Sequence, residues 1–291
     1  MTDTIERIGN SIIQHGKNSD RIYLMSLNIK DLPGITLKLE ELANKNGYTK
    51  IIVKAPVCHK GLFEMKGYKT EAVIPKLYNG DDGCFICKYL DSDRSDDLFR
   101  MKCSEILQTA LQKDKESCDL QLPEGFVCRQ ANERDISAMV ELYKRVFESY
   151  PFPIHEEEYI LKTMRDNVIY FGIWNKNKLV ALSSIECTCQ YSNAEMTDFA
   201  VLEEYRGNGF ARYLLIAMEK KLRSLSVKTA YTIARAKSAG MNITFAKNGY
   251  TYAGTLINNT DISGQIESMN VWYKYLLEEW VETSANHINY L

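Results

Sequence analysis

A short loop with two glycines is the feature that most constrains this chain. Residues 201–212 read VLEEYRGNGFAR, in which an apolar pair and two acids lead through Gly207 and Gly209 into a leucine-rich helical pattern. A loop that opens a helix presents unpaired backbone amides at the positive end of the helix dipole, and glycine lets a ligand approach the backbone closely. The segment therefore predicts a phosphate-binding site that follows a strand.

Two common phosphate-binding motifs do not fit this loop. A P-loop needs Gly-Lys-Ser/Thr, but Gly209 is followed by Phe210 and Ala211, which excludes nucleoside triphosphate chemistry of that kind. A dinucleotide fold needs a strand that runs directly into Gly-x-Gly-x-x-Gly, whereas residues 203–205 intervene here and the sixth position is Arg212. A second interpretation also stays open, in which the glycines only allow the helix to begin and the loop binds no ligand.

The patterns around the loop predict an α/β domain in the second half of the chain. A polar run at 112–117 and Pro123-Glu124-Gly125 separate residues 1–122 from residues 123–291. From periodicity and turn signals we expect, in order, strand 126–129, helices 136–147 and 156–165, strands 168–174, 179–189 and 195–202, helix 213–225, strand 230–236, helix 241–248, and strands 251–257 and 266–275.

The two halves resemble each other weakly. Residues 50–53 and 63–68 lie 182 positions before 232–235 and 245–250, and the short matches come in the same order in both halves. Such ordered self-similarity indicates a degenerate internal repeat. Residues 30–35 stand where the second half has its glycine loop, so the first copy has lost that loop.

Composition favours a globular protein with small partners. The net charge is -2 and no long single-sign run is present, so neither nucleic acid nor an anionic membrane is an expected partner. No apolar run reaches signal-peptide or membrane-span length, and we expect a cytoplasmic protein. The metal-like spacing Cys84-Phe85-Ile86-Cys87 reads as a strand that points its two thiols to opposite faces, and the four histidines are scattered, so no metal is expected.

The loop is similar to the pyrophosphate loop of the Gcn5-related N-acetyltransferase (GNAT) family, Gln/Arg-x-x-Gly-x-Gly/Ala, and residues 206–211 match every fixed position. The order of elements over 126–276 also resembles that family. The resemblance implies a mixed, mostly antiparallel sheet flanked by helices, preceded by a degenerate GNAT-like N-terminal domain, with acetyl-CoA as co-substrate. The residues that it implies for acetyl-CoA are Phe199, Ala200, Val201, Arg206, Gly207, Asn208, Gly209, Phe210, Ala211 and Ser238.

Acetyl transfer to an amine needs a base, because an alkyl ammonium with a pKa of about 10.4 must lose a proton before it attacks the thioester. The resemblance places Glu195 where the family commonly has a glutamate base, with Asp198 as an alternative that would face the other way along a strand. Phe245 stands where the family usually has a tyrosine acid. Tyr250, Tyr252, water, or unaided departure of a thiol of pKa about 8.5 stay open in its place.

Residues 149–154, 197–201 and 245–250 look like the β-lysine N-acetyltransferase branch of the family. That resemblance implies transfer to the ε-amine of β-lysine, which gives the osmolyte N-ε-acetyl-β-lysine beside a lysine 2,3-aminomutase. An acceptor with two ammonium groups and one carboxylate needs acids and a cation in its pocket. The candidates are Glu186, Glu195 and Asp198 for the spare ammonium, Arg145 or Arg165 for the carboxylate, and Tyr150 and Phe152 as pocket walls in a proline-stiffened loop.

Three rival functions also fit the sequence: acetyl transfer to another small amine, acetyl transfer to a protein lysine, and binding of acetyl-CoA by a non-catalytic sensor. A protein acetyltransferase would need an open groove, and the bulky loop at 150–154 argues against one. A non-catalytic acetyl-CoA sensor would bind its ligand without turnover. The first domain packs over the acceptor side, builds a homodimer, or only stabilises the second domain; the sequence leaves these three arrangements open.

Overall fold

The structure is a computed structural model that describes residues 3–116 and 120–276. The elements of the first half are β1 (Thr4–Ile8), β2 (Ser11–Gly16), β3 (Arg21–Ser26), α1 (Ile35–Asn46), β4 (Lys50–Pro56), α2 (Lys60–Glu64), β5 (Lys69–Tyr78), β6 (Asp81–Tyr89) and α3 (Arg100–Leu111). The elements of the second half are β7 (Phe126–Gln130), α4 (Ile136–Val146), α5 (Glu157–Asp166), β8 (Val168–Asn175), β9 (Lys178–Thr188), β10 (Asn193–Val201), α6 (Phe210–Ser224), β11 (Thr229–Arg235), α7 (Ala239–Lys247), β12 (Thr251–Ile262) and β13 (Gln265–Tyr275).

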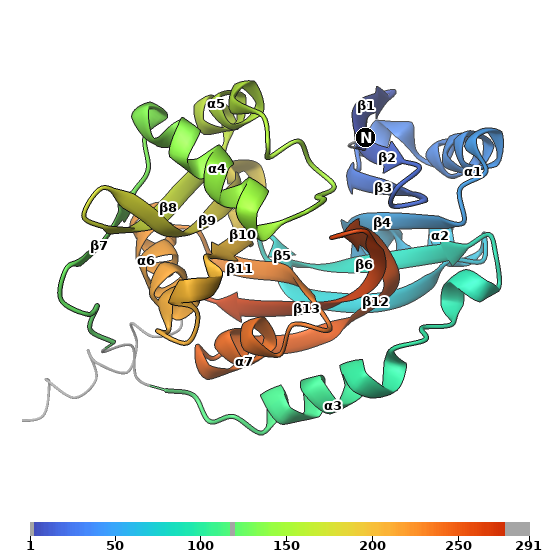
Figure 1. Cartoon of the computed structure of the whole chain (residues 1–291). Coiled ribbons are helices and arrows are strands. Elements are labelled where there is room, and N and C mark those ends of the chain that lie inside the picture. Colours follow the sequence, from blue (N-terminus) through green and yellow to red (C-terminus); the bar gives the residue numbers. More distant parts are fainter. Residues whose placement is uncertain (1–2, 117–119, 277–291) are drawn as a thin grey trace, which may run out of the picture.

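The strands of both halves join in a single mixed sheet with the order β1-β2-β3-β4-β6-β5-β12-β13-β11-β10-β9-β8-β7 (Figure 1). The sets β1-β2-β3-β4-β6-β5 and β8-β9-β10-β11-β13-β12 have the same connections. In each set the third and fourth strands are parallel and the other neighbours are antiparallel. The second half adds β7, α4 and α5 at its start. The two halves therefore share one strand topology.

The halves meet at the strands β5 and β12, which pair in antiparallel fashion. Gly254 of β12 has φ +150, and a Cβ at this position would lie 2.0 Å from the carbonyl oxygen of Glu71. Only glycine fits so close an approach of two backbones. Arg94 of the first half adds a hydrogen bond of 2.8 Å from its Nε to the carbonyl of Asn258 on the same strand.

Helices cover both faces of the sheet, and one of its hydrophobic clusters contains side chains of both halves. Side chains of α4 and α5 pack in the same cluster as Tyr23, Ile52 and Phe85 from the first half. A second cluster contains α6 and α7. Tyr170 and Phe171 are neighbours on β8 and belong to the first and second cluster, so the two clusters lie on opposite faces of the sheet. The first half is therefore packed against the α4 side of the second.

The elements predicted between 126 and 275 are all present with shifted ends. The helix after the glycine loop begins at Phe210, earlier than expected, because Gly209 is its N-cap. The strand β12 runs on to Ile262 through a polar stretch, since pairing with β13 supplies its hydrogen bonds. Cys84 and Cys87 lie on β6 as predicted, in two different hydrophobic clusters.

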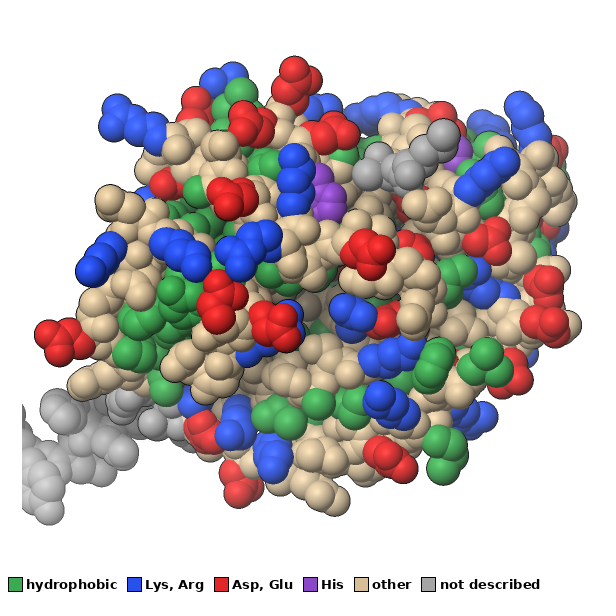
Figure 2. Space-filling model, viewed as in Figure 1, with side chains coloured by type: hydrophobic (Ala, Val, Ile, Leu, Met, Phe, Trp, Pro, Cys, Tyr) green, Lys and Arg blue, Asp and Glu red, His purple; other side chains and the backbone are tan. Residues whose placement is uncertain are grey.

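Charged side chains of both signs are interspersed on the face shown in Figure 2, in keeping with the net charge of -2. Among the helices of the described residues, none is long and apolar enough to cross a lipid bilayer.

Candidate active site

The glycine loop follows β10 and opens α6, as the sequence predicts. Gly207 has φ 84 and Gly209 has φ 73, a left-handed conformation that glycine adopts without steric strain. The Nδ2 of Asn208 donates a hydrogen bond of 3.0 Å to the carbonyl of Tyr205 and so holds the loop. Because the first amides of a helix have no carbonyl partner within it, the start of α6 can bind an anion.

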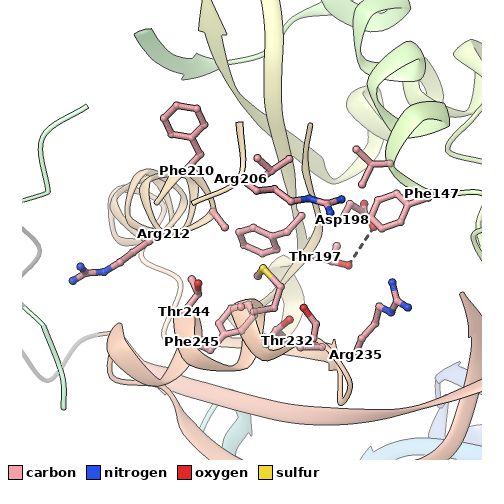
Figure 3. Close-up of a pocket in the computed structure, with 18 of the residues that line it drawn as sticks. Phe147, Thr197, Asp198, Arg206, Phe210, Arg212, Thr232, Arg235, Thr244 and Phe245 are labelled. Carbon is pink, nitrogen blue, oxygen red and sulfur yellow. Dashed lines mark hydrogen bonds between the residues drawn. The ribbon is translucent and has the colours of Figure 1, made fainter. Parts of the chain in front are cut away.

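A cavity of about 700 Å³, which we name the outer cavity, lies beside this loop between α6, α7, β10 and β11 (Figure 3). Of the ten residues predicted for acetyl-CoA, eight line it: Phe199, Val201, Arg206, Gly207, Gly209, Phe210, Ala211 and Ser238. The other two do not: Asn208 is exposed on the loop, and Ala200 is buried where it pairs with Leu182 of β9.

The outer cavity exists because two parallel strands separate. The pairing of β10 with β11 ends at Glu195 and Tyr231, after three residues. Beyond that point the register of β10 with β9 shifts between Thr197 and Ala200, and Asp198 within this irregularity has φ 56. An extra residue in one strand bends it and redirects its side chains. Backbone groups of β10 are thereby left facing the opening.

A second cavity of about 100 Å³, the inner cavity, adjoins the outer one. The residues that line both cavities are Tyr150, Thr197, Asp198, Ile233, Ile262 and Met269. The predicted acceptor residues Tyr150, Phe152 and Glu186 line the inner cavity together with Glu195 and Asp198. Arg21, Tyr23 and Lys54 line it from the first half. The inner cavity is therefore enclosed by both halves of the chain.

Glu195 and Glu186 are half-buried residues of the lining of this inner cavity. Burial first, and then Glu186, raise the pKa of Glu195 to about 7, while Lys54 and a hydrogen bond with Tyr231 act in the opposite direction. Burial also raises the pKa of Glu186, as does Asp198, against the attraction of Lys54. The Nζ of Lys54 lies 3.0 Å from the hydroxyl of Tyr231, so this lysine reaches the site from the first half.

Asp198 lies where the two cavities meet. Strand periodicity predicts that it faces away from Glu195, but that prediction is wrong, because the irregularity in β10 turns Asp198 into the same cavity. Its carboxylate accepts hydrogen bonds from Tyr150 at 2.6 Å and from Ser184 at 2.5 Å. Burial raises the pKa of Asp198, and these hydrogen bonds oppose the rise.

The structure does not support Tyr250 as a general acid. Tyr250 is 5% exposed, and its ring packs in the core with a centroid 5.1 Å from that of Phe245. Burial raises its pKa well above the usual range, and Glu219 adds to the rise. Phe245, at the position of the family's tyrosine, lines the outer cavity, whereas Tyr250 is absent from the described linings of both cavities.

The two arginines predicted for an acceptor carboxylate also lie elsewhere. Arg145 forms an exposed ion pair of 3.2 Å with Glu204, and Arg165 forms one of 2.9 Å with Glu133. The cation that does line the inner cavity beside Lys54 is Arg21. It stands at the start of β3 after a polar turn, a position that is typical of an exposed strand end, so no local signal identifies it.

Comparison with known proteins agrees with this site. Residues 136–250 match the family model described as acetyltransferase (GNAT) family. The chain is 40% identical to the beta-lysine N(6)-acetyltransferase of Methanococcus maripaludis, over 94% of this chain and 98% of that one. It is 36% identical to the protein of the same name from Methanosarcina mazei, over 82% and 95%. It is 33% identical to the N-acetyltransferase YodP of Bacillus subtilis, over 85% and 88%.

The chain belongs to the acetyltransferase (GNAT) family, which confirms the resemblance seen in its loop and element order. It is an N-acetyltransferase that uses acetyl-CoA, and the second half carries the GNAT fold.

Proposed function

We propose that this enzyme transfers the acetyl group of acetyl-CoA to the ε-amine of β-lysine. The observation that carries the proposal is the inner cavity, which is lined by carboxylates and cations and adjoins the outer cavity at Asp198. An acceptor with two ammonium groups and one carboxylate complements such a lining. Two relatives named beta-lysine N(6)-acetyltransferase, aligned over 94% and 82% of this chain, support the same acceptor.

The outer cavity is the proposed binding site of acetyl-CoA. Its pyrophosphate would bind the amides of residues 207–211 at the start of α6, beside Arg206. Its pantetheine arm would pair with the backbone of residues 199–201, which β11 leaves unpaired on that side. Ser238, the N-cap of α7, lies on the opposite wall. This arrangement brings the thioester toward Asp198, where the cavities meet.

Glu195 is the proposed general base. The acceptor ammonium must lose a proton, and a carboxyl group with a pKa of about 7 is half ionised near neutral pH and can take that proton. The neutral amine then attacks the thioester carbonyl carbon, so that a C–N bond forms and the C–S bond breaks. Coenzyme A, whose thiol has an ordinary pKa of about 8.5, leaves as the thiolate without Tyr250, and this thiolate takes up the surplus proton of the newly bonded nitrogen. Asp198 is the alternative base, and Glu186 holds the spare ammonium.

We further propose that residues 1–122 are a degenerate GNAT-like copy and that residues 123–291 carry out the transfer. The repeated strand order of the two halves supports this division. Four further statements stay predictions of the family resemblance: a cytoplasmic location, a homodimer, a lysine 2,3-aminomutase as the source of β-lysine, and an osmolyte role for the product.

The proposal is tested by thiol release from acetyl-CoA with β-lysine, α-lysine, a polyamine and a lysine-rich peptide offered separately. We expect fast release with β-lysine and little with the peptide. The Glu195→Gln variant should lower kcat with β-lysine by about 100-fold, the loss typical of a missing general base. Turnover of the peptide alone would favour a protein acceptor, and acetyl-CoA binding without turnover of any amine would favour a sensor.

A further inference from the structure

Arg21 is a buried cation that has no carboxylate partner. The residue is 4% exposed and lines the inner cavity. Its Nη1 donates to the carbonyl of Asn259 at 2.9 Å and its Nη2 donates to Oε1 of Gln14 at 3.3 Å, while its Nε has no hydrogen-bond partner. Asp3 attracts it only at longer range, and no carboxylate of the described residues forms an ion pair with it.

A second buried arginine of the first half shows what a purely structural role looks like. Arg94 is 8% exposed and forms an ion pair of 3.2 Å with Asp20. It also donates hydrogen bonds to the carbonyls of Asn258 and Ser19. Arg94 is thus compensated by the chain itself, and it lines neither of the two cavities.

A buried charge that forms no direct ion pair is costly unless a ligand supplies a partner, and the longer-range attraction of Asp3 only partly offsets the burial of Arg21. Burial lowers the pKa of Arg21 to about 10, so the guanidinium still carries its charge at neutral pH. The fork of N–H donors in a guanidinium matches the geometry of a carboxylate. Gln14 connects Arg21 to the loop of residues 149–154, because its Nε2 donates a hydrogen bond of 3.1 Å to the carbonyl of Pro151.

The inner cavity has two chemically different ends. Asp198 and Thr197 also line the outer cavity, so this end faces the expected thioester. Arg21 and Gln14 line the inner cavity alone, and both come from the first half. A linear acceptor that places its reacting amine beside Asp198 would extend its other end toward Arg21.

We propose that Arg21 binds the carboxylate of the acceptor, so that the first half of the chain selects free amino acids over polyamines and peptide-bound lysine. The inference rests on the proposed function and deepens it, because it assigns the acceptor's carboxylate to a residue outside the GNAT half. Polyamines carry no carboxylate, and a lysine side chain in a protein has its own carboxyl group in a peptide bond. Both classes would leave Arg21 without a carboxylate in direct contact.

The test compares β-lysine with β-lysinamide, in which the carboxylate is a neutral amide, on the wild-type enzyme and on Arg21→Gln. We expect the wild type to prefer β-lysine by about 100-fold in kcat/KM, since loss of one partner of a buried charge pair has effects of this size or larger. Arg21→Gln should lower kcat/KM for β-lysine by a similar factor, mainly through KM, and should leave β-lysinamide within about threefold. The preference for the free acid is then lost.

Matched variants separate recognition from folding. Arg94→Gln removes a buried arginine from the same half and should lower thermal stability while the preference for β-lysine is kept. Arg21→Lys keeps the charge and should retain a preference of at least about tenfold. The KM for acetyl-CoA should stay within about twofold of wild type in every folded variant. If Arg21→Gln does not fold, the wild-type comparison and Arg21→Lys still decide the question.

The inference is overturned if wild type acetylates β-lysine and β-lysinamide equally well, or if Arg21→Gln slows both acceptors by the same factor. The proposed function can fail separately. If wild type rejects β-lysine but acetylates another free amino acid, that acid and its amide replace the β-lysine pair, and Arg21 is judged on them. If only amines without a carboxylate are acetylated, both the acceptor assignment and the role of Arg21 are wrong.

Discussion

The Glu195→Gln variant is expected to change activity and stability in opposite directions. Burial raises the pKa of Glu195 from the ordinary 4.5 to about 7, with Glu186 as the next cause. The difference corresponds to about 3 kcal/mol between the folded and unfolded chain once the carboxyl group is ionised. A neutral glutamine at this position avoids that cost, but it cannot accept a proton.

The kinetic consequence follows from the ionised fraction of Glu195. With a pKa of about 7, only about a tenth of the carboxyl groups are ionised at pH 6, so kcat/KM should be about tenfold lower there than on the plateau above pH 8. Glu195→Gln should abolish this dependence and lower kcat by about 100-fold. Glu186→Gln removes a negative neighbour and should move the midpoint of the wild-type profile to lower pH.

The consequence for stability has the opposite sign. Between pH 4.5 and about 7 the folded chain holds a proton at Glu195 that the unfolded chain has lost. The free energy of unfolding therefore falls as the pH rises through this window and levels off above it. Glu195→Gln should be more stable than wild type by up to about 3 kcal/mol at pH 8 and by less than about 1 kcal/mol at pH 5.

Urea unfolding at both pH values, alongside pH-rate profiles with β-lysine, measures these effects. An exposed acid such as Glu141, changed to glutamine, is the control and should alter neither the rate nor the pH dependence of stability. A kinetic midpoint near 4.5 in the wild type, or a Glu195→Gln variant that is less stable than wild type at pH 8, would refute the burial argument. The general-base role fails if that variant keeps most of its kcat.

Three further substitutions are expected to act through different parts of the chain. Tyr250→Phe should leave kcat within about twofold, because the described linings of both cavities lack Tyr250; a loss of about 100-fold would restore it as the acid. Gly209→Val should raise the KM for acetyl-CoA by about tenfold or more, since a β-branched residue is strained at φ 73 at the start of α6, where we propose that the pyrophosphate binds. An unchanged KM would mean that the pyrophosphate binds elsewhere. Gly254→Val should lower the free energy of urea unfolding by about 3 kcal/mol, because its Cβ would lie 2.0 Å from the carbonyl oxygen of Glu71; wild-type stability would contradict the tight junction of β5 and β12.

Local patterns determined the element order of the second half and its phosphate loop. These patterns are helical periodicity, strand alternation and the glycines of residues 207–209. Each is a property of a few neighbouring residues, so it can be identified from the sequence alone. The loop in turn led to the family, and the family to Glu195. The same reason explains why the sequence does not predict the end of β12. Residues 258–261 are polar, and the strand continues because residues 260–262 pair with β13 beyond an irregularity in the register.

Tertiary structure decided which residues line the inner cavity. Strand periodicity predicts that Asp198 faces away from Glu195. The irregularity in the pairing of β10 with β9 instead places both side chains in the same cavity. Arg21 and Lys54 enter the inner cavity only because β5 and β12 join the two halves into one sheet. Contacts between residues so distant in the chain depend on strand pairing and packing over the whole fold. No local run of sequence encodes these contacts. The sequence therefore predicted the glycine loop that we propose for acetyl-CoA, and only the fold placed the charged groups that line the inner cavity.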